Sequence, residues 1–337
     1  MGRMEALGFP LRQEAVLKTL TQDVLKSSEI EGALLDPDQV RSSIARRLGM
    51  DIGGLKPADR DVEGVVDMTL DATGEFEKPL NEGRLFAWHA SFFSTGHGGM
   101  AKIRAGAWRD DSGGPMQVVS GPYGKERVHY VAPPARRLDS EISAFLGWFN
   151  DDADADTDPV LKAGLAHLWF VTIHPFDDGN GRIARAIADM ALARSERSVQ
   201  RFYSMSAQIR LERDAYYETL EATQKGAMDV TGWQEWFLGC FMRAIAGAED
   251  TLASVLFKSR FWNRFATEPL NERQIKVLNR LLDGFEGKLT SSKWAKLAKC
   301  SQDTAYRDIL DLIKRGALTK NPEGGRSTSY DLADIRG

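Results

Sequence analysis

His174-Pro175-Phe176-Asp177-Asp178-Gly179-Asn180-Gly181-Arg182-Ile183-Ala184-Arg185 is a polar stretch that separates two segments with helical patterns. The segment before it, 159–173, is apolar, with Asp158 placed to cap a helix and Pro159 in the first helical position. The segment after it has a helical pattern from Arg182 to about Arg197. The sequence therefore predicts two helices joined by a short polar turn.

The turn itself has the features of an anion site. Gly179 and Gly181 allow the backbone to turn tightly with its N–H groups pointing inward, and Asn180 tolerates the left-handed conformation. Exposed amides at the start of a helix attract anions, and the helix dipole adds to this attraction. Arg182 and Arg185 lie three residues apart on one helix face, where both reach phosphate oxygens.

The two remaining polar residues add a metal ligand and a base. The Asp178 carboxylate repels a phosphate at this site unless a cation lies between them, and Mg²⁺ bridging Asp178 to two phosphates removes that conflict. His174, with an ordinary pKa of about 6.5, suits a general base. The turn lacks the glycine spacing and the Lys-Ser/Thr pair of a Walker-type phosphate loop. These residue types together predict nucleotide-dependent group transfer.

The stretch resembles the signature of the Fic family, His-x-Phe-x-Asp/Glu-Gly-Asn-Gly-Arg-x-x-Arg, and matches it at every fixed position. The resemblance implies a mainly α fold, a Fic-type helical bundle with a β-hairpin flap. It also implies an enzyme that transfers AMP from ATP to a hydroxyl side chain of a protein, with Phe176 anchoring the loop in the core.

The same resemblance implies a role for each polar residue of the signature. His174 deprotonates the target hydroxyl, and Asp178 holds Mg²⁺. The amides of Gly179, Asn180 and Gly181 cradle the α- and β-phosphates. Arg182 orients the phosphates, and Arg185 holds the γ-phosphate.

Ser27-Ser28-Glu29-Ile30-Glu31-Gly32 resembles the inhibitory helix motif of the family, Ser/Thr-x-x-x-Glu-Gly/Asn. Ser27 and Glu31 are four residues apart and share a helix face. Taken alone, Glu31 is an ordinary surface glutamate. The resemblance implies that Glu31 pairs with Arg185 and blocks productive γ-phosphate placement. It places the chain in the class whose inhibitory helix, followed here by Gly32, precedes the signature.

Strand-forming residues broken by glycine turns predict a β-hairpin within residues 104–134. The resemblance implies that this hairpin is the flap, which aligns the target segment through Val128, His129, Tyr130 and Val131. Val128 also counts among the predicted nucleotide contacts. The alternative is a hairpin without a role in catalysis.

Tyr217 and Gln224 are seven residues apart and share a helix face. The resemblance implies that both contact the nucleotide, although core packing of Tyr216 and Tyr217 explains the pattern nearly as well. His167, within the apolar segment 159–173, is expected to be a hydrogen-bonded core histidine. The segment 206–225 is predicted as a single helix.

The chain from Asn271 onward differs in charge from the rest. It holds 13 Lys and Arg against 9 Asp and Glu, whereas the whole chain has a net charge of −4. Helices over 272–282, 291–299 and 302–315, followed by strands near 318–320 and 329–332, resemble a winged helix. DNA binding would use these groove-facing and phosphate-facing residues: Gln302, Thr304, Tyr306, Arg307, Lys293, Lys320 and Arg326. Because Asp303, Asp308 and Asp311 lie on the same helix, protein docking and dimerisation stay open as well.

These observations predict three regions in the 337-residue chain. Residues 1–100 form a helical region with the inhibitory helix at about 16–32. Residues 101–265 form the catalytic core with the flap, and 270–337 form the winged helix. Two cysteines exclude a disulfide scaffold and a cysteine metal site. The absence of an apolar stretch of about 20 residues excludes a membrane span and favours a cytoplasmic protein.

The leading interpretation is an autoinhibited protein adenylyltransferase that uses ATP and Mg²⁺ and modifies a target protein or itself. One alternative is hydrolytic removal of AMP, with Glu31 activating water near His174. Another is a DNA-binding regulator whose core senses a nucleotide, which would not need the base His174. The sequence leaves a homodimer open.

Overall fold

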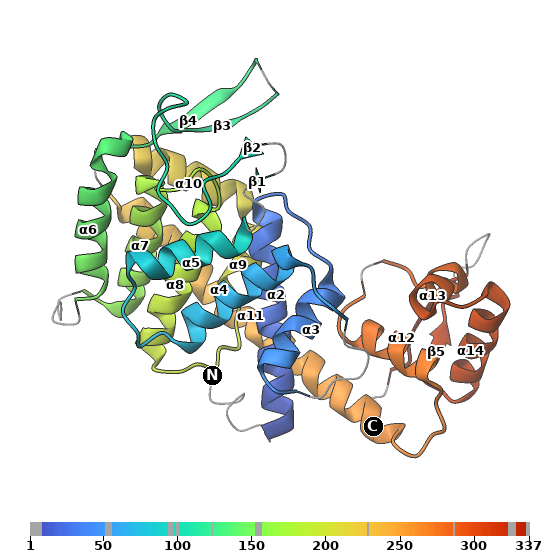
Figure 1. The fold of residues 1–337 in the computed structure, drawn as a ribbon. Helices are drawn as coiled ribbons and strands as arrows, with labels where there is room; N and C mark the ends of the chain where they lie inside the picture. Colours follow the sequence, from blue (N-terminus) through green and yellow to red (C-terminus); the bar gives the residue numbers. More distant parts are fainter. Residues whose placement is uncertain are drawn as a thin grey trace. The chain divides into compact units, whose positions relative to one another are not determined.

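Helical segments dominate the described chain, as the apolar periodicity predicts (Figure 1). The computed structural model describes residues 9–50, 56–93, 97–98, 101–122, 124–151, 157–227, 229–285, 287–322 and 328–334. It divides into two compact units, one of residues 16–249 and one of residues 2–15 with 250–337. The predicted boundaries near residues 100 and 270 stay predictions. No described helix combines the length and the apolar character that crossing a membrane requires.

Four helices form the N-terminal part of the described chain, and short polar side chains cap the starts of two of them. α2 (Phe9–Ile30) is a single continuous helix and is followed by α3 (Pro37–Arg47), α4 (Arg60–Gly74) and α5 (Glu82–Phe92). The Asp36 carboxylate accepts hydrogen bonds from the first turn of α3, and the Asn81 side chain does the same for α5. α4 packs against α3, α5 and α8.

The centre of the larger unit is a pair of helices, α7 (Pro159–Ile173) and α8 (Asn180–Glu196), which pack along each other. α6 (Leu138–Phe149) covers α7. α7 is apolar on nearly every side because it is enclosed by neighbours. At Gly164 an added Cβ would lie 2.9 Å from Phe237 Cδ1 of α11 (Thr231–Arg264), so a larger residue on α7 would displace this buried ring. The Asp158 cap and the first-turn Pro159 are confirmed.

The segment predicted as a single helix over 206–225 is in fact two helices, so that prediction is wrong. α9 (Met205–Leu211) and α10 (Arg213–Lys225) are separated at Glu212, whose φ of −107° and ψ of 28° leave the helical range. The Glu212 carboxylate accepts two hydrogen bonds from Arg243 of α11, each 2.6 Å long. This tertiary contact fixes Glu212, and helix propensity alone does not reveal it.

Two short strand pairs belong to the larger unit. β3 (Gln117–Ser120) and β4 (Arg127–Val131) form the predicted antiparallel hairpin, with Val118 opposite Tyr130 and an irregularity between Val118 and Val119. β1 (His97–Gly98) and β2 (Ala101–Lys102) form a second antiparallel pair. This second pair was not among the predicted elements, since two-residue strands have no periodicity to detect.

The smaller unit contains α12 (Glu272–Leu282), α13 (Ser291–Ala298), α14 (Gln302–Lys314), β5 (Leu318–Lys320) and β6 (Tyr330–Leu332). The two strands pair antiparallel around a core that includes Trp294, Ile309 and Leu312. Asn271 and Gln274 form a capping box at the start of α12. The predicted order of elements is confirmed, and the likeness to a winged helix stays a prediction.

Candidate active site

The turn between α7 and α8 is closed by one side chain. Asn180 Oδ1 accepts a hydrogen bond from the Phe176 N–H (3.0 Å), and Asn180 Nδ2 donates to the Phe176 carbonyl (2.8 Å). Asn180 is the first residue of α8 and lacks a positive φ, so the predicted left-handed conformation and the helix start near Arg182 are both wrong. The left-handed residue is Gly179, with φ +81°. The asparagine amide, rather than its backbone freedom, shapes this turn.

The start of α8 presents backbone donors to the site. A helix that begins at Asn180 leaves the N–H groups of residues 180–182 without acceptors in the helix. The Gly179 N–H donates to Asp178 Oδ1 at 2.5 Å. A Cβ on Gly181 would lie 2.2 Å from Glu31 Oε1, so a side chain at this position would require the Glu31 carboxylate to move. This arrangement agrees with the predicted anion site.

His174 follows α7 directly and has a left-handed backbone, with φ 51° and ψ 57°. Its Nδ1 lies 3.2 Å from the Val171 carbonyl, which can only accept a hydrogen bond. This contact assigns the imidazole proton to Nδ1 and leaves the Nε2 lone pair available for a proton. Burial lowers the pKa of His174 from its ordinary value. The imidazole is therefore neutral near pH 7, as a general base requires.

His89 of α5 supports the turn from the core, and the sequence pattern did not single it out. Its ring stacks on Phe176 with centroids 4.1 Å apart and planes inclined by 6°. Nδ1 accepts the Gly106 N–H at 3.0 Å, so the ring proton lies on Nε2 and faces the Asp178 carbonyl 3.2 Å away. Burial lowers the pKa of His89 to about 4. A neutral histidine thus braces the residue predicted to hold Mg²⁺.

Arg185 is the site of the predicted contact with α2. Its Nη2 donates to Glu31 Oε1 (2.8 Å) and to the Ser27 carbonyl (2.8 Å), and its Nε donates to Ser27 Oγ (3.0 Å). Arg185 is 2% exposed, and its Nη1 has no hydrogen-bond partner among the described residues. Gly32, with φ +82°, follows the end of α2. The predicted pairing of Glu31 with Arg185 is confirmed as a contact.

Arg182 and Asp178 flank the N-terminus of α8. The Arg182 guanidinium lies over the rings of Phe92 (4.8 Å) and Phe93 (5.5 Å), and its buried Nε has no hydrogen-bond partner in the described chain. The described residues contain no cluster of three or more metal-ligating side chains. Mg²⁺ commonly binds through one or two carboxylates together with substrate phosphates. The exposed Asp178 carboxylate beside an anion site fits that mode of binding.

The predicted flap residues divide into two pairs. Val128 and Val131 are 41% and 51% exposed, whereas His129 and Tyr130 are half-buried. The Tyr130 hydroxyl donates to the Thr172 carbonyl at 3.0 Å, which fixes β4 to the end of α7. His129 Nδ1 lies 2.6 Å from a Glu221 carboxylate oxygen of α10. The hairpin is thus held at defined points beside the turn.

α10 carries Tyr217 and Gln224, the two residues predicted to contact the nucleotide. Gln224 Nε2 donates to Thr172 Oγ1 at the end of α7 (3.2 Å). The Tyr217 hydroxyl is 3.4 Å from the Ile30 carbonyl at the end of α2. His167 is buried, with Nε2 3.0 Å from the Tyr216 hydroxyl, which confirms the predicted core histidine.

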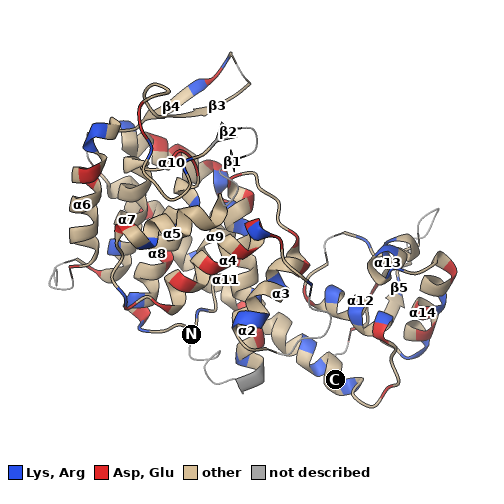
Figure 2. Ribbon diagram, in the orientation of Figure 1, with Lys and Arg blue, Asp and Glu red and all other residues tan. Residues whose placement is uncertain are grey.

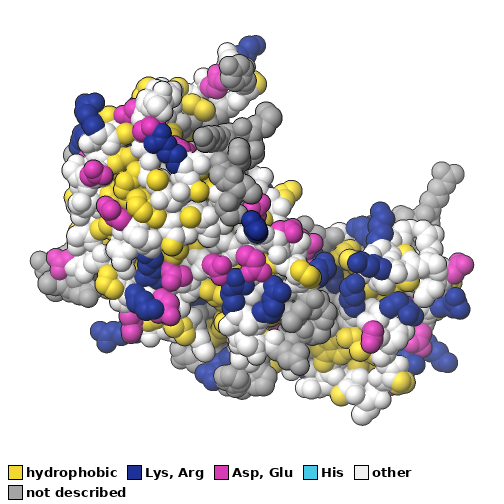
Figure 3. All heavy atoms as spheres, in the orientation of Figure 1, with side chains coloured by type: hydrophobic (Ala, Val, Ile, Leu, Met, Phe, Trp, Pro, Cys, Tyr) yellow, Lys and Arg dark blue, Asp and Glu magenta, His cyan; other side chains and the backbone are white. Residues whose placement is uncertain are grey.

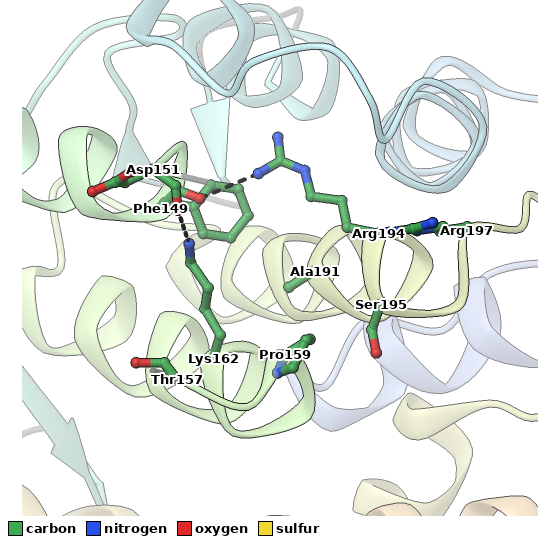
Figure 4. Close-up of a pocket in the computed structure, with 9 residues that line it drawn as sticks. All are labelled: Phe149, Asp151, Thr157, Pro159, Lys162, Ala191, Arg194, Ser195 and Arg197. Atoms are coloured by element: carbon green, nitrogen blue, oxygen red, sulfur yellow. Dashed lines mark hydrogen bonds between the residues drawn. The ribbon is translucent and has the colours of Figure 1, made fainter. Parts of the chain in front are cut away.

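A separate cavity of about 490 Å³ lies at the other ends of α7 and α8 (Figure 4). Its cations contact backbone carbonyls: Lys162 Nζ donates to Asp151 (2.8 Å), and Arg194 Nη1 donates to Phe149 (3.2 Å). The lining residues are Phe149, Asp151, Thr157, Pro159, Lys162, Ala191, Arg194, Ser195 and Arg197. None of the signature residues lines this cavity.

Sequence comparisons show which known proteins this chain is similar to. A sequence model described as Fic/DOC family matches residues 79–192, and one described as a domain of unknown function (DUF4172) matches residues 1–50. "Protein adenylyltransferase fic-1" of Caenorhabditis briggsae is 38% identical over 55 residues, 16% of this chain and 11% of that protein. "Protein adenylyltransferase Fic" of Culex quinquefasciatus is 28% identical over 131 residues, 38% of this chain and 25% of that protein. Each alignment thus spans a quarter or less of the relative's length.

Two solved structures share the fold. A Fic family protein from Desulfovibrio desulfuricans G20 has a TM-score of 0.51 at 20% identity, covering 98% of this chain and 90% of that chain. A Fic domain containing signaling protein from Bacteroides thetaiotaomicron VPI-5482 has a TM-score of 0.54 at 17% identity, covering 75% and 94%. The segment that matches the Fic/DOC family model contains the complete signature at the turn between α7 and α8, so residues 79–192 form a Fic/DOC domain.

Proposed function

We propose that this protein transfers AMP from ATP to a Ser, Thr or Tyr hydroxyl of a protein, with itself as one acceptor. The supporting observation is the turn between α7 and α8. A neutral His174 with a free Nε2 adjoins a helix start whose N–H groups lack acceptors in the helix. The names of the partial relatives point to the same reaction.

In the proposed reaction the acceptor oxygen attacks the α-phosphorus, and its proton passes to His174 Nε2. The bond between the α-phosphorus and the bridging oxygen to the β-phosphate breaks, and pyrophosphate leaves. The N–H groups at the start of α8 and the Arg182 guanidinium stabilise the charge on the phosphate oxygens. Mg²⁺, when bound at Asp178, supplies further charge neutralisation. Val128, Tyr217 and Gln224 are the proposed contacts on the nucleotide side.

We further propose that Glu31 restrains this activity. Glu31 Oε1 occupies the space in front of Gly181 and is bonded to Arg185 Nη2, the donor proposed for the γ-phosphate. A γ-phosphate at Arg185 and the Glu31 carboxylate would place two anions on one guanidinium. ATP in the reactive orientation therefore requires Glu31 to leave.

The test is mass spectrometry of purified protein after incubation with ATP and Mg²⁺. Three proteins are compared: wild type, Glu31→Gly and Glu31→Gly/His174→Ala. An AMP adduct that appears with Glu31→Gly and vanishes in the double variant supports both proposals. If none of the three carries an adduct, transfer to itself is excluded, and removal of AMP from a modified protein becomes the reaction to assay.

We also propose that the smaller unit binds duplex DNA, because two of the three acidic residues of α14 are paired with arginines. Asp308 accepts hydrogen bonds from Arg273 of α12 (3.0 and 3.1 Å), and Asp311 accepts one from Arg315 (2.9 Å). Both acids are therefore neutralised by partners. Figure 2 marks Lys and Arg residues on and near α13, and Figure 3 shows Lys and Arg side chains on the surface of this region. Lys293 and Lys296 of α13 are exposed.

DNA binding of this kind weakens steeply with salt because counterions are released. A titration of duplex DNA at several salt concentrations should give a negative slope of log affinity against log salt, and Lys296→Glu should make that slope shallower by about one or more. Lys78→Glu makes the same charge change on an exposed residue of the other unit and should leave the slope unaltered. Binding that is absent at low salt would exclude DNA and leave protein docking or a homodimer.

A further inference from the structure

Arg109 is a buried arginine next to the catalytic turn, and it lies outside the signature. It precedes β3 in the chain and is 3% exposed. Its Nε donates to the His174 carbonyl at 2.7 Å, and its backbone N–H donates to the Pro175 carbonyl at 3.0 Å. Its Nη2 donates to the Pro133 carbonyl at 2.5 Å. One residue thus binds two successive carbonyls of the turn.

The backbone at His174 needs such support. A left-handed φ of 51° is unfavourable for a residue with a Cβ, and it persists only where the surroundings fix it. The next residue, Pro175, has no N–H to offer a neighbouring carbonyl. Arg109 donates hydrogen bonds to the carbonyls of this turn from outside it. Within the described chain, the His174 ring itself hydrogen-bonds only to the Val171 carbonyl, at the end of α7, through Nδ1.

The charge of Arg109 acts on the same imidazole. Besides burial, the Arg109 guanidinium lowers the pKa of His174, whereas Glu31, directly after α2, and Asp178 of the turn raise it. The acid closest to Arg109 is Asp111, with an Nη1 to Oδ1 distance of 3.3 Å. Arg109 therefore opposes the two carboxylates that would otherwise favour the charged imidazolium.

We propose that Arg109 is a positioning residue for His174: it clamps the strained turn in the orientation that aims Nε2 at the acceptor, and its charge favours the neutral imidazole. The inference rests on the proposed role of His174 as the base. Arg109 acts on His174 in two ways: its hydrogen bonds hold the turn, and its charge favours the neutral imidazole.

Two variants separate these contributions. Arg109→Met removes the charge and the side-chain bonds, whereas Arg109→Lys keeps the charge but lacks the fork that reaches both the His174 and Pro133 carbonyls. Arg109→Gln, which also lacks the charge, replaces Arg109→Met if the latter does not fold, as judged by near-ultraviolet circular dichroism. All variants are made in the Glu31→Gly protein, so that Glu31 does not contribute to the comparison.

The first readout is an NMR titration of the His174 imidazole, which needs no turnover. The pKa of His174 should rise by roughly one unit in Arg109→Met and stay within a few tenths of the parent in Arg109→Lys. Arg104→Met, which removes a nearby exposed cation paired with Asp110, should leave the pKa unchanged. An unchanged pKa in Arg109→Met overturns the charge part of the proposal, whatever reaction the protein performs.

The second readout is the pH profile of AMP transfer. Both Arg109→Met and Arg109→Lys should lower kcat about 10- to 100-fold with the KM for ATP within about threefold, because the base is misplaced while the nucleotide site remains. The acidic limb of kcat should move to higher pH only in Arg109→Met. A kcat within twofold of the parent in Arg109→Lys overturns the positioning role. If the parent itself transfers no AMP, the proposed function fails, and the titration still decides the effect of Arg109 on His174.

Discussion

The two ends of the α7–α8 pair both present arginines, yet they use them in opposite ways. At the end near the cavity, the Arg194 guanidinium donates to the Phe149 carbonyl (Figure 4). It also donates to the carbonyls of Phe76 and Lys78 and to Asn150 Oδ1. At the signature end, buried donors of Arg182 and Arg185 have no partner in the described chain. A buried donor without an acceptor costs about 1–3 kcal/mol. The difference indicates which end is built for a ligand and which for stability.

The largest expected effect tests the base at the signature end. In the Glu31→Gly background, His174→Ala should lower the rate of AMP transfer about 10²–10⁴-fold, because no other group at the turn accepts the hydroxyl proton. ATP binding, measured by calorimetry, should persist because the α8 N-terminus is unchanged. Near-normal turnover would remove His174 from the role of base.

The second prediction concerns the partner of Arg185. Glu31→Gly should raise self-modification at least about tenfold, since each 1.4 kcal/mol of restraint corresponds to a factor of ten. Glu29→Gln is the matched control: its carboxylate contacts Lys26 and Arg210 on the same stretch of α2 but not Arg185. Equal rates in the wild type and Glu31→Gly would exclude inhibition by Glu31.

The third prediction tests the other end. Arg194→Met should lower the free energy of unfolding by about 2–4 kcal/mol, because several backbone carbonyls lose a charged donor. Arg197→Met, an exposed arginine of the same cavity, should change it by less than about 0.5 kcal/mol. Urea titration gives both values, and the transfer rate per folded molecule should stay within about twofold. A slower transfer rate in Arg194→Met would contradict the division of roles between the two ends.

The smallest effect comes from the middle of α7, where burial lowers the pKa of His167 to about 3. A pKa below the unfolded value means that the stability from this residue is present above about pH 6.5 and is lost as pH falls toward 3. Between pH 6.5 and 4.5 that loss is about 2–3 kcal/mol. His167→Gln should flatten this part of the stability profile, measured by urea unfolding at each pH. The lowered pKa of His89 reduces stability at low pH equally in the wild type and in His167→Gln. If the free energy of unfolding has the same slope against pH in both proteins, His167 does not contribute.

Local patterns in the sequence predicted the residues that lie close together in the chain. The signature, the Asp158 cap and the ends of α7 are set by neighbours a few residues away, which periodicity and capping rules describe. The contact of Glu31 with Arg185 spans 154 residues, and only the resemblance to a known motif made it predictable.

His89 and Arg109, which hold the turn through hydrogen bonds, were not predicted from the sequence because their contacts depend on tertiary packing. His89 contacts a carbonyl 89 residues away, and Arg109 contacts one 65 residues away. Neither residue type nor spacing distinguishes them from an ordinary histidine and arginine. The prediction of a left-handed backbone at Asn180 was wrong for a related reason. Asn180 shapes the turn through hydrogen bonds between its side-chain amide and the Phe176 backbone, and not through its backbone preference.

The close contact between Gly181 and Glu31 limits which substitutions can release inhibition by Glu31 without loss of activity. A methyl group there would collide with Glu31 Oε1, and it would project from the same helix start that faces the phosphates. Substitutions at residue 31 remove the restraint and leave the helix start intact, whereas substitutions at 181 disturb both. Selection for higher activity from a randomised library should therefore enrich changes at residue 31 and deplete every replacement of Gly181. Enrichment of Gly181→Ala would contradict this expectation.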